Sequence, residues 1–214
     1  MKQILTLALS AILIVTACSK KKDDATAESN SVIIGGKEYS TVTIGTQIWT
    51  STNYNGDGGV NYNNGTNSST NGKLYTLAEA KAVSLPSGWR LPTKEDYEKL
   101  LVNQGGTKPS TGDIEVNATI ARKLIPSSWT NGANGTNTSG FNALPVGVYA
   151  NSQFEYQGDI AAFWTSSTVV ESSGIFNYSF GISNAEDGGI RDLEAYLDWS
   201  RPADKLSIRF VKNK

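Results

Sequence analysis

The residues that could carry chemistry in this sequence are few, because the chain contains one cysteine and no histidine. Without an imidazole it cannot build a Ser-His or Cys-His catalytic pair or a histidine-containing zinc site. Among the groups that remain are the thiol of Cys18, the guanidinium of Arg90 and scattered carboxylates. A single thiol forms no disulfide within the chain. The sequence therefore predicts no catalytic residue, no metal ligands and no cofactor.

The thiol of Cys18 lies where a lipid anchor would be attached. Lys2 precedes an apolar run, "ILTLALSAILIV" (residues 4–15), which is shorter than the roughly 20 residues needed to span a bilayer. The run leads into "VTAC", a small-residue cleavage site that resembles a bacterial lipobox. We therefore expect residues 1–17 to be a lipoprotein signal peptide and Cys18 to be acylated, with a membrane as partner. A plain signal peptide with a chance cysteine is the alternative.

Residues 18–31, "CSKKKDDATAESNS", are charged and small and contain no aromatic residue. Such a segment cannot bury enough surface to order itself, so it is typical of a flexible tether. Ser19, in place of aspartate after the cysteine, fits export to an outer membrane. The run "KKKDD" resembles the surface-export signals of some Bacteroidota lipoproteins, and a solvated spacer is the bland alternative. We expect an outer-membrane, lipid-anchored protein, with its orientation left open.

Residues 32–214 are predicted to form one α+β domain. Capping boxes begin at Thr76 and at Thr93, which indicates helices over residues 77–84 and 94–103. "VNATIARKLI" (residues 116–125) has apolar residues four apart and predicts a weaker third helix. Short strands are expected at the start of the domain, around two glycine-containing turns, and again late in the chain. Helices early and strands at both ends are typical of α+β folds rather than βαβ folds.

Six segments occur in an order that resembles a known family. They are "TVTIGTQIWTSTNY", "GKLYTLAEA", "LPSGWRLPTKEDYEKLL", "GFNALPVGVY", "FWTSST" and "SIRFVKN". Together they are similar to the Fibrobacter succinogenes major paralogous domain, over about residues 32–214. The resemblance implies a C-type lectin-like fold: a twisted antiparallel sheet with paired N- and C-terminal strands, two main flanking helices and long irregular loops.

The motif "GWRLPT" is shared with formylglycine-generating enzymes, which have a related fold. That chemistry depends on an active-site cysteine pair, and the one cysteine here is at the lipid anchor. We therefore expect a non-catalytic protein, in which Trp89 plugs the junction before a helix and Arg90 supports a loop. A carboxylate pair for glycoside hydrolysis, such as Glu155 and Asp159, is the remaining enzymatic alternative.

The resemblance also implies a place for a disulfide that this chain lacks. Members of the family commonly have a cysteine just before the proline of "PSGW" and another in the last strand. Here those positions hold Leu85 and Phe210. Since both are apolar, we expect them to pack together in place of the covalent link.

Two loops rich in Asn, Gly, Ser and Thr, residues 53–72 and 127–140, are the predicted ligand-binding surface. Amides and isolated aromatic rings suit adaptable binding, and a metal-independent carbohydrate is the leading ligand. The expected contacts are Trp129, Asn131, Asn134, Tyr54 and Tyr62. The alternatives are solvated loops and a structural or assembly role in the envelope, with another envelope protein as partner. The formal net charge of −1 gives no electrostatic footprint for nucleic acid.

Calcium is not expected, because the triplets of calcium-dependent lectins (Glu-Pro-Asn, Gln-Pro-Asp and Trp-Asn-Asp) are absent. Glu186, Asp187 and Asp192 occur in one Gly-containing turn and are the alternative set of oxygen ligands for a hard cation.

If Cys18 carries lipid, cells fed labelled palmitate should incorporate it into the wild-type chain and not into Cys18→Ala, because the substitution removes the acceptor thiol. Gel fluorography of the immunoprecipitated chains measures this. Equal labelling of the two chains would contradict the anchor.

Overall fold

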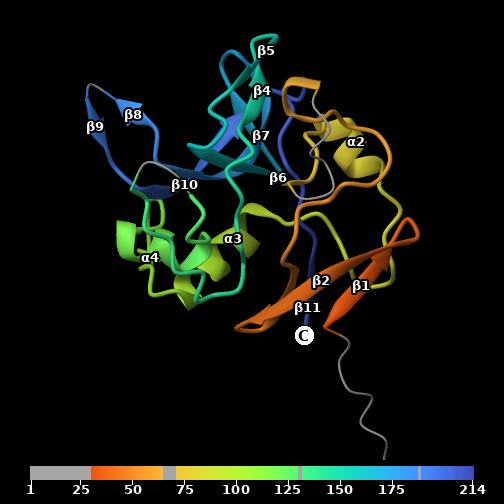
Figure 1. Cartoon of the computed structure of the whole chain (residues 1–214), viewed down its shortest axis with the longest axis horizontal. Coiled ribbons are helices and arrows are strands. Elements are labelled where there is room, and N and C mark those ends of the chain that lie inside the picture. Colours follow the sequence, from red (N-terminus) through yellow and green to blue (C-terminus); the bar gives the residue numbers. More distant parts are fainter. Residues whose placement is uncertain (1–29, 65–70, 130–131, 188) are drawn as a thin grey trace, which may run out of the picture.

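The computed structural model describes residues 30–64, 71–129, 132–187 and 189–214, and Figure 1 shows how its elements are arranged. The signal peptide, Cys18 and most of the tether lie outside these residues. The strands are β1 Ser31–Ile34, β2 Lys37–Ile44, β3 Gln47–Thr50, β4 Val148–Ala150, β5 Gln153–Glu155, β6 Ile160–Glu171, β7 Gly174–Ser183, β8 Glu186–Asp187, β9 Ile190–Arg191, β10 Glu194–Ser200 and β11 Val211–Asn213. The helices are the one-turn η1 (Tyr62–Asn64), α2 (Leu77–Ala82), α3 (Lys94–Asn103) and α4 (Ala118–Leu124).

A four-stranded antiparallel sheet joins the two ends of the domain. Its strand order is β1-β2-β3-β11, and Val211 of β11 pairs with Trp49 of β3. The predicted opening meander and the pairing of N- and C-terminal strands are therefore confirmed. The last strand is short, since residues 205–207 of the alternating run "KLSIRFV" (residues 205–211) make only isolated bridges before β11 begins.

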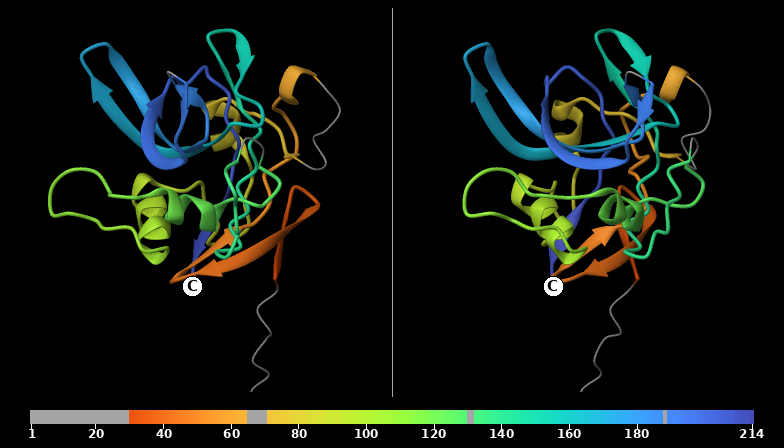
Figure 2. Two further views of the ribbon diagram at one scale, coloured as in Figure 1. Left: turned by 60° about the vertical axis from the view of Figure 1, so that its left-hand side comes forward. Right: turned by 90° about the vertical axis from the view of Figure 1, so that its left-hand side faces the viewer.

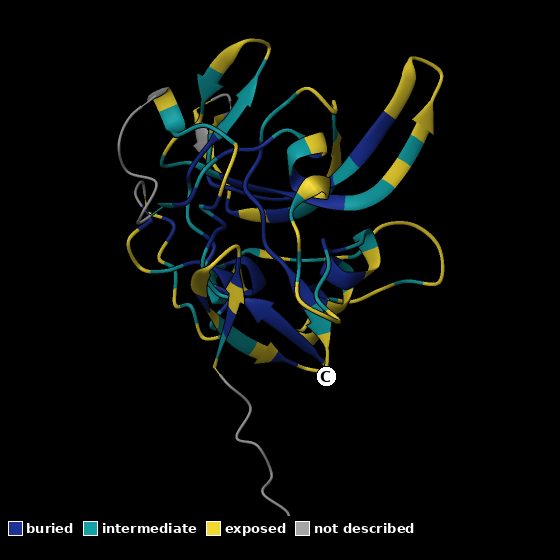
Figure 3. Ribbon diagram, turned by 90° about the vertical axis from the view of Figure 1, so that its right-hand side faces the viewer, coloured by how far each residue is buried: buried dark blue, intermediate teal, exposed yellow. Residues whose placement is uncertain are grey.

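A second sheet has the order β10-β7-β6 and curls strongly, as Figure 2 shows. The register shifts between Trp164 and Thr168, where the chain departs from regular pairing with β7. Beyond this irregularity the β6–β7 hairpin projects from the body, and Figure 3 shows its tip exposed and its base buried. Two small hairpins, β4-β5 and β8-β9, complete the strands.

The helices begin at the predicted caps. Thr76 and Thr93 each accept a bond from the backbone N–H three residues on, and the carboxylates of Glu79 and Asp96 bond back to the cap. α3 has the predicted bounds, whereas α2 ends at Ala82 and α4 runs over Ala118–Leu124, shorter than the sequence indicates. No helix in the described ranges is long and apolar enough to cross a membrane.

The segment before α3 has a structural role, as expected. Arg90 forms an ion pair with Asp96 through both of its terminal nitrogens, and Nη2 lies 2.8 Å from Oδ1. The same carboxylate accepts bonds from the Thr93 N–H (2.7 Å) and from Gln47 Nε2 (2.8 Å). Burial opposes ionisation of Asp96, but the bonds from Arg90 and Thr93 outweigh it and lower its pKa. Arg90 therefore links the segment that precedes α3 to the first turn of that helix.

Two hydrophobic clusters share the curled sheet, because β6 turns alternate side chains to opposite faces. Ala161 and Phe163 belong to the helix-side core, with α3 and α4, while Ala162 and Trp164 belong to the second core, with α2 and the opening strands. Phe210 is buried in the second core and Leu85 packs against that same cluster, while direct packing of the two side chains on each other stays a prediction.

Arg209 is the most unusual buried residue. Its side chain is fully buried, although the alternation of "KLSIRFV" puts it on the face opposite to the apolar residues. The guanidinium donates four hydrogen bonds, each 2.7 Å long, to Asn53 Oδ1 and to the carbonyls of Thr50, Phe141 and Asn142. The ring centroid of Phe141 lies 4.9 Å from the guanidinium carbon. Arg209 therefore holds together three segments that are distant in sequence.

The architecture is α+β, with mostly antiparallel strands, as the sequence predicts. β10 is the main element that the sequence analysis missed.

Arg209→Met should lower the free energy of unfolding by more than about 3 kcal/mol, because it leaves three backbone carbonyls without a buried donor, at about 1–3 kcal/mol each. Urea unfolding measures the change. Arg201→Met is the control: Arg201 is an exposed residue that bonds Asn151 Oδ1, and its loss should cost about 0.5 kcal/mol or less. A loss below about 1 kcal/mol for Arg209→Met would show that the guanidinium is not a structural hub.

Candidate ligand-binding site

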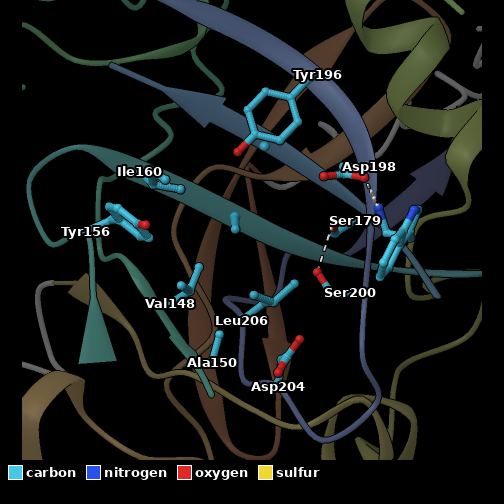
Figure 4. A pocket seen from close by; sticks show the side chains of 13 residues that line it. Val148, Ala150, Tyr156, Ile160, Ser179, Tyr196, Asp198, Ser200, Asp204 and Leu206 are labelled. Atoms are coloured by element: carbon cyan, nitrogen blue, oxygen red, sulfur yellow. Dashed lines mark hydrogen bonds between the residues drawn. The ribbon is translucent and has the colours of Figure 1, made fainter. Parts of the chain in front are cut away.

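A cleft of about 150 Å³ lies on the face of the curled sheet that is turned away from α3 and α4 (Figure 4). Its floor is apolar and continues the second core, since Leu206 is a member of that cluster and Val148 and Ile160 pack against it. Polar and aromatic side chains surround this floor. The lining residues are Val148, Ala150, Tyr156, Ile160, Ala162, Ser179, Gly181, Tyr196, Asp198, Trp199, Ser200, Asp204 and Leu206.

The register of the sheet explains which residues meet in the cleft. Ala162, Gly181 and Tyr196 lie opposite one another on β6, β7 and β10. In the next layer toward the hairpin tip, Ser179 lies opposite Asp198. Because side chains two apart on a strand share a face, β10 presents Tyr196, Asp198 and Ser200 to the cleft, while Ala195 and Leu197 contact the helix-side core.

Gly181 makes room for the ring of Tyr196. A Cβ on Gly181 would lie 2.3 Å from the Tyr196 ring, so the ring occupies the space that any other residue would fill. Cross-strand packing of an aromatic ring over a glycine fixes the ring against the sheet. Burial, with the nearby charges of Glu194 and Asp198, raises the pKa of the Tyr196 phenol to about 12. At neutral pH this phenol is therefore protonated and can donate a hydrogen bond.

Two carboxylates lie at the rim. Asp198 Oδ1 accepts a bond from the N–H of Trp199 (2.7 Å), and Asp204 Oδ2 accepts one from the N–H of Arg201 (2.9 Å). These bonds come from the local backbone and use one oxygen of each carboxylate. The second oxygen of each has no protein donor among the described residues and can accept from a ligand.

Hydroxyls and aromatic rings complete the lining. Ser200 Oγ donates to Ser179 Oγ at 3.1 Å across the two strands, as Figure 4 shows. Tyr156 is 51% exposed and Trp199 43% exposed, which leaves both aromatic side chains accessible to solvent. Trp199 pairs with Tyr178 and shares the face of Ala195 and Leu197. Its ring therefore packs 4.2 Å from that of Phe176 on the side of the sheet opposite the cleft, and Tyr156 and Tyr196 supply the rings of the cleft. The cleft therefore offers carboxylate acceptors, hydroxyls and aromatic faces together.

A second cavity, of about 380 Å³, lies beside α2. It is lined by Gly35, Tyr54, Asp57, Gly58, Glu79, Ala82, Val83 and Ser84. The Glu79 carboxylate is already used in the fold, since it accepts bonds from the Thr76 N–H and hydroxyl and from the Gly59 N–H. This cavity is larger, but its chief polar group is committed to the helix cap, so the cleft on the curled sheet is the better candidate.

Trp129 is not available for a ligand. Its ring is 5% exposed and belongs to the helix-side core, and its Nε1 donates to the carbonyl of Ala143 at 2.7 Å. Trp129 and Ala133 point inward, while Ser128, Gly132 and Asn134 face solvent. The expectation that Trp129 makes ligand contact is therefore wrong, and its truncation would create a core cavity.

The other expected contacts do not come together. Tyr54 is 5% exposed, and its ring packs on Phe210 and Tyr75 in the second core. It lines the second cavity and not the cleft. Tyr62 is half-buried against Phe154. Asn134 is exposed in a left-handed conformation, and Asn131 lies outside the described residues, as does Cys18.

The acidic turn near residue 186 forms the small hairpin β8-β9. Arg191 lies 3.5 Å from a carboxylate oxygen of Glu186 and 2.9 Å from one of Asp159, so these charges pair with a guanidinium. Within the part of the chain that the structure describes, no three His, Cys, Asp or Glu residues cluster in a way that could hold a metal ion.

The sequence analysis missed Tyr196, Asp198 and Asp204. A signal for two of them exists, because "EAYLDWS" alternates apolar residues with Tyr196 and Asp198 as a half-buried strand would. The contribution of Asp204 depends on tertiary placement and has no local signal.

Comparison with curated proteins and with solved structures gives no significant match. A family model described as the Fibrobacter succinogenes major domain matches residues 42–212, which cover the curled sheet, the helices α2, α3 and α4, and the cleft. The chain therefore belongs to the Fibrobacter succinogenes major domain family.

Proposed function

We propose that this protein is a non-catalytic, lipid-anchored envelope protein whose domain binds a saccharide in the cleft of the curled sheet. The observation that carries the proposal is the combination of exposed aromatic rings, carboxylates and hydroxyls over an apolar floor. Such concave sites, mostly apolar with a few placed polar groups, are the usual form of small-ligand sites.

A saccharide matches both kinds of surface in the cleft. The C–H faces of a sugar ring are apolar and pack against aromatic rings such as Tyr156, while its hydroxyls need acceptors and donors at the edge. Asp198 and Asp204 supply acceptors, and the protonated phenol of Tyr196 supplies a donor. The Tyr196 ring is held against Gly181, so little side-chain entropy is lost when a ligand binds.

The proposal includes two features that the sequence suggests. The paired terminal strands and the curled second sheet support a C-type lectin-like arrangement, and "VTAC" supports acylation of Cys18 and an outer-membrane location. Sugar hydroxyls can bond the rim carboxylates directly, so binding requires no divalent cation.

The full chain in detergent, applied to a glycan array with chelator present, should retain a defined set of glycans. Tyr196→Ala should weaken binding to them by at least about tenfold, because the aromatic anchor is lost. Tyr178→Ala is the matched control, since Tyr178 lies on β7 with its ring under Lys94, outside the cleft.

Retention of no glycan by the wild type would contradict saccharide binding. Loss of binding on adding chelator would contradict metal independence, and cleavage of a bound glycan would contradict the non-catalytic role. Equal weakening by Tyr196→Ala and Tyr178→Ala would place the site outside the cleft.

A further inference from the structure

We propose that the cleft selects a saccharide that carries a free, protonated amino group. This inference rests on the proposed function and names the substrate class of the same site. It follows from the negative charge of the lining, from the engagement of the nearest lysine and arginine outside the cleft, and from the aromatic rings.

The lining of the cleft carries negative charge alone. Asp198 and Asp204 are its ionisable acids, and none of the lining residues is a lysine or an arginine. The ion pairs of the described residues join other carboxylates, those of Asp96, Asp113, Glu98, Asp159 and Glu186. No side-chain cation of the described chain is therefore paired with either carboxylate of the cleft.

The cations that flank the cleft in sequence are engaged elsewhere. Arg201 Nη1 bonds Asn151 Oδ1 at 3.0 Å, and Lys205 Nζ lies 5.5 Å from the ring centroid of Tyr149. Although both follow β10 closely, neither side chain lines the cleft. The charge of the two carboxylates is thus left for a ligand to balance.

An ammonium group fits this lining better than a neutral hydroxyl does. It can bond the free oxygen of either Asp198 or Asp204, and charge-assisted bonds are about twice as strong as neutral ones. The rings of Tyr156 and Tyr196 add negative π faces that attract a cation. A uronic acid or a phosphorylated sugar would instead place like charges together.

The amino group alone does not account for the cleft. Its apolar floor and the Ser179–Ser200 hydroxyl pair match the body of a sugar ring, which a bare alkylammonium ion lacks. The geometry therefore points to an amino sugar rather than to a lysine side chain.

Isothermal titration of the full chain in detergent with a chitosan oligosaccharide and with the chitin oligosaccharide of equal length tests the proposal. The two probes differ only in whether the amine is free or acetylated. Near pH 6, where an amine is protonated, chitosan should bind at least about tenfold more tightly. Its affinity should fall as salt is added, because Asp198 is exposed to solvent and its charge is screened.

The double variant Asp198→Asn/Asp204→Asn should remove most of this preference, since the amides keep the shape and lose the charge, and the two single variants identify which carboxylate holds the amine. Asp192→Asn is the matched control, an exposed aspartate outside the cleft that should leave the preference unchanged. Thermal unfolding of each variant verifies that it is folded.

Equal binding of the two oligosaccharides would overturn the preference for an amine and leave saccharide binding intact. Binding of neither would overturn both. A lysine-rich peptide of equal charge that binds as tightly as chitosan would overturn the assignment to a sugar.

Discussion

The fold depends on a buried cation that has no anionic partner. Arg209 bonds four neutral oxygens, from Thr50 at the end of β3, from Asn53 and from residues 141 and 142, and it lies against the rings of Phe141 and Phe163. Burial lowers the pKa of the guanidinium, while acceptors for four of its five N–H groups make the buried charge tolerable. Because Arg209 is pinned on one side, Ile208 and Phe210 are directed to the other side, into the second core.

The position of the cleft follows from this arrangement. The C-terminal segment passes from β10 through Leu206 to β11, and Leu206 belongs both to the second core and to the floor of the cleft. The second core covers the β6 end of the curled sheet and does not reach β10. The uncovered part of the same face is where Tyr196, Asp198 and Ser200 are exposed to ligand, so the site begins where the packing of the core ends.

Local signals in the sequence predicted the elements whose structure is decided locally. The cap at Thr93 and the apolar stripe that follows it give the bounds of α3, and glycine turns give the opening meander. The composition of its loop predicted that Trp129 contacts a ligand. That prediction failed because a loop rich in Asn and Gly can still bury one large ring in the core. The role of Arg209 has no local signal, since a lone arginine in an alternating strand indicates a solvated face, and the carbonyls that converge on it come from distant segments. The cleft depends on pairing between β7 and β10, which no single segment reveals.

The central claim is that the cleft of β10-β7-β6 is the ligand site, and amide chemical shifts during titration of the isotope-labelled protein with a chitosan oligosaccharide test it most directly. The account predicts that the largest shifts fall on Ser179, Gly181, Tyr196 and Asp198, on two neighbouring strands. Shifts concentrated at Gly58 and Glu79, which line the second cavity, or the absence of any shift, would contradict it.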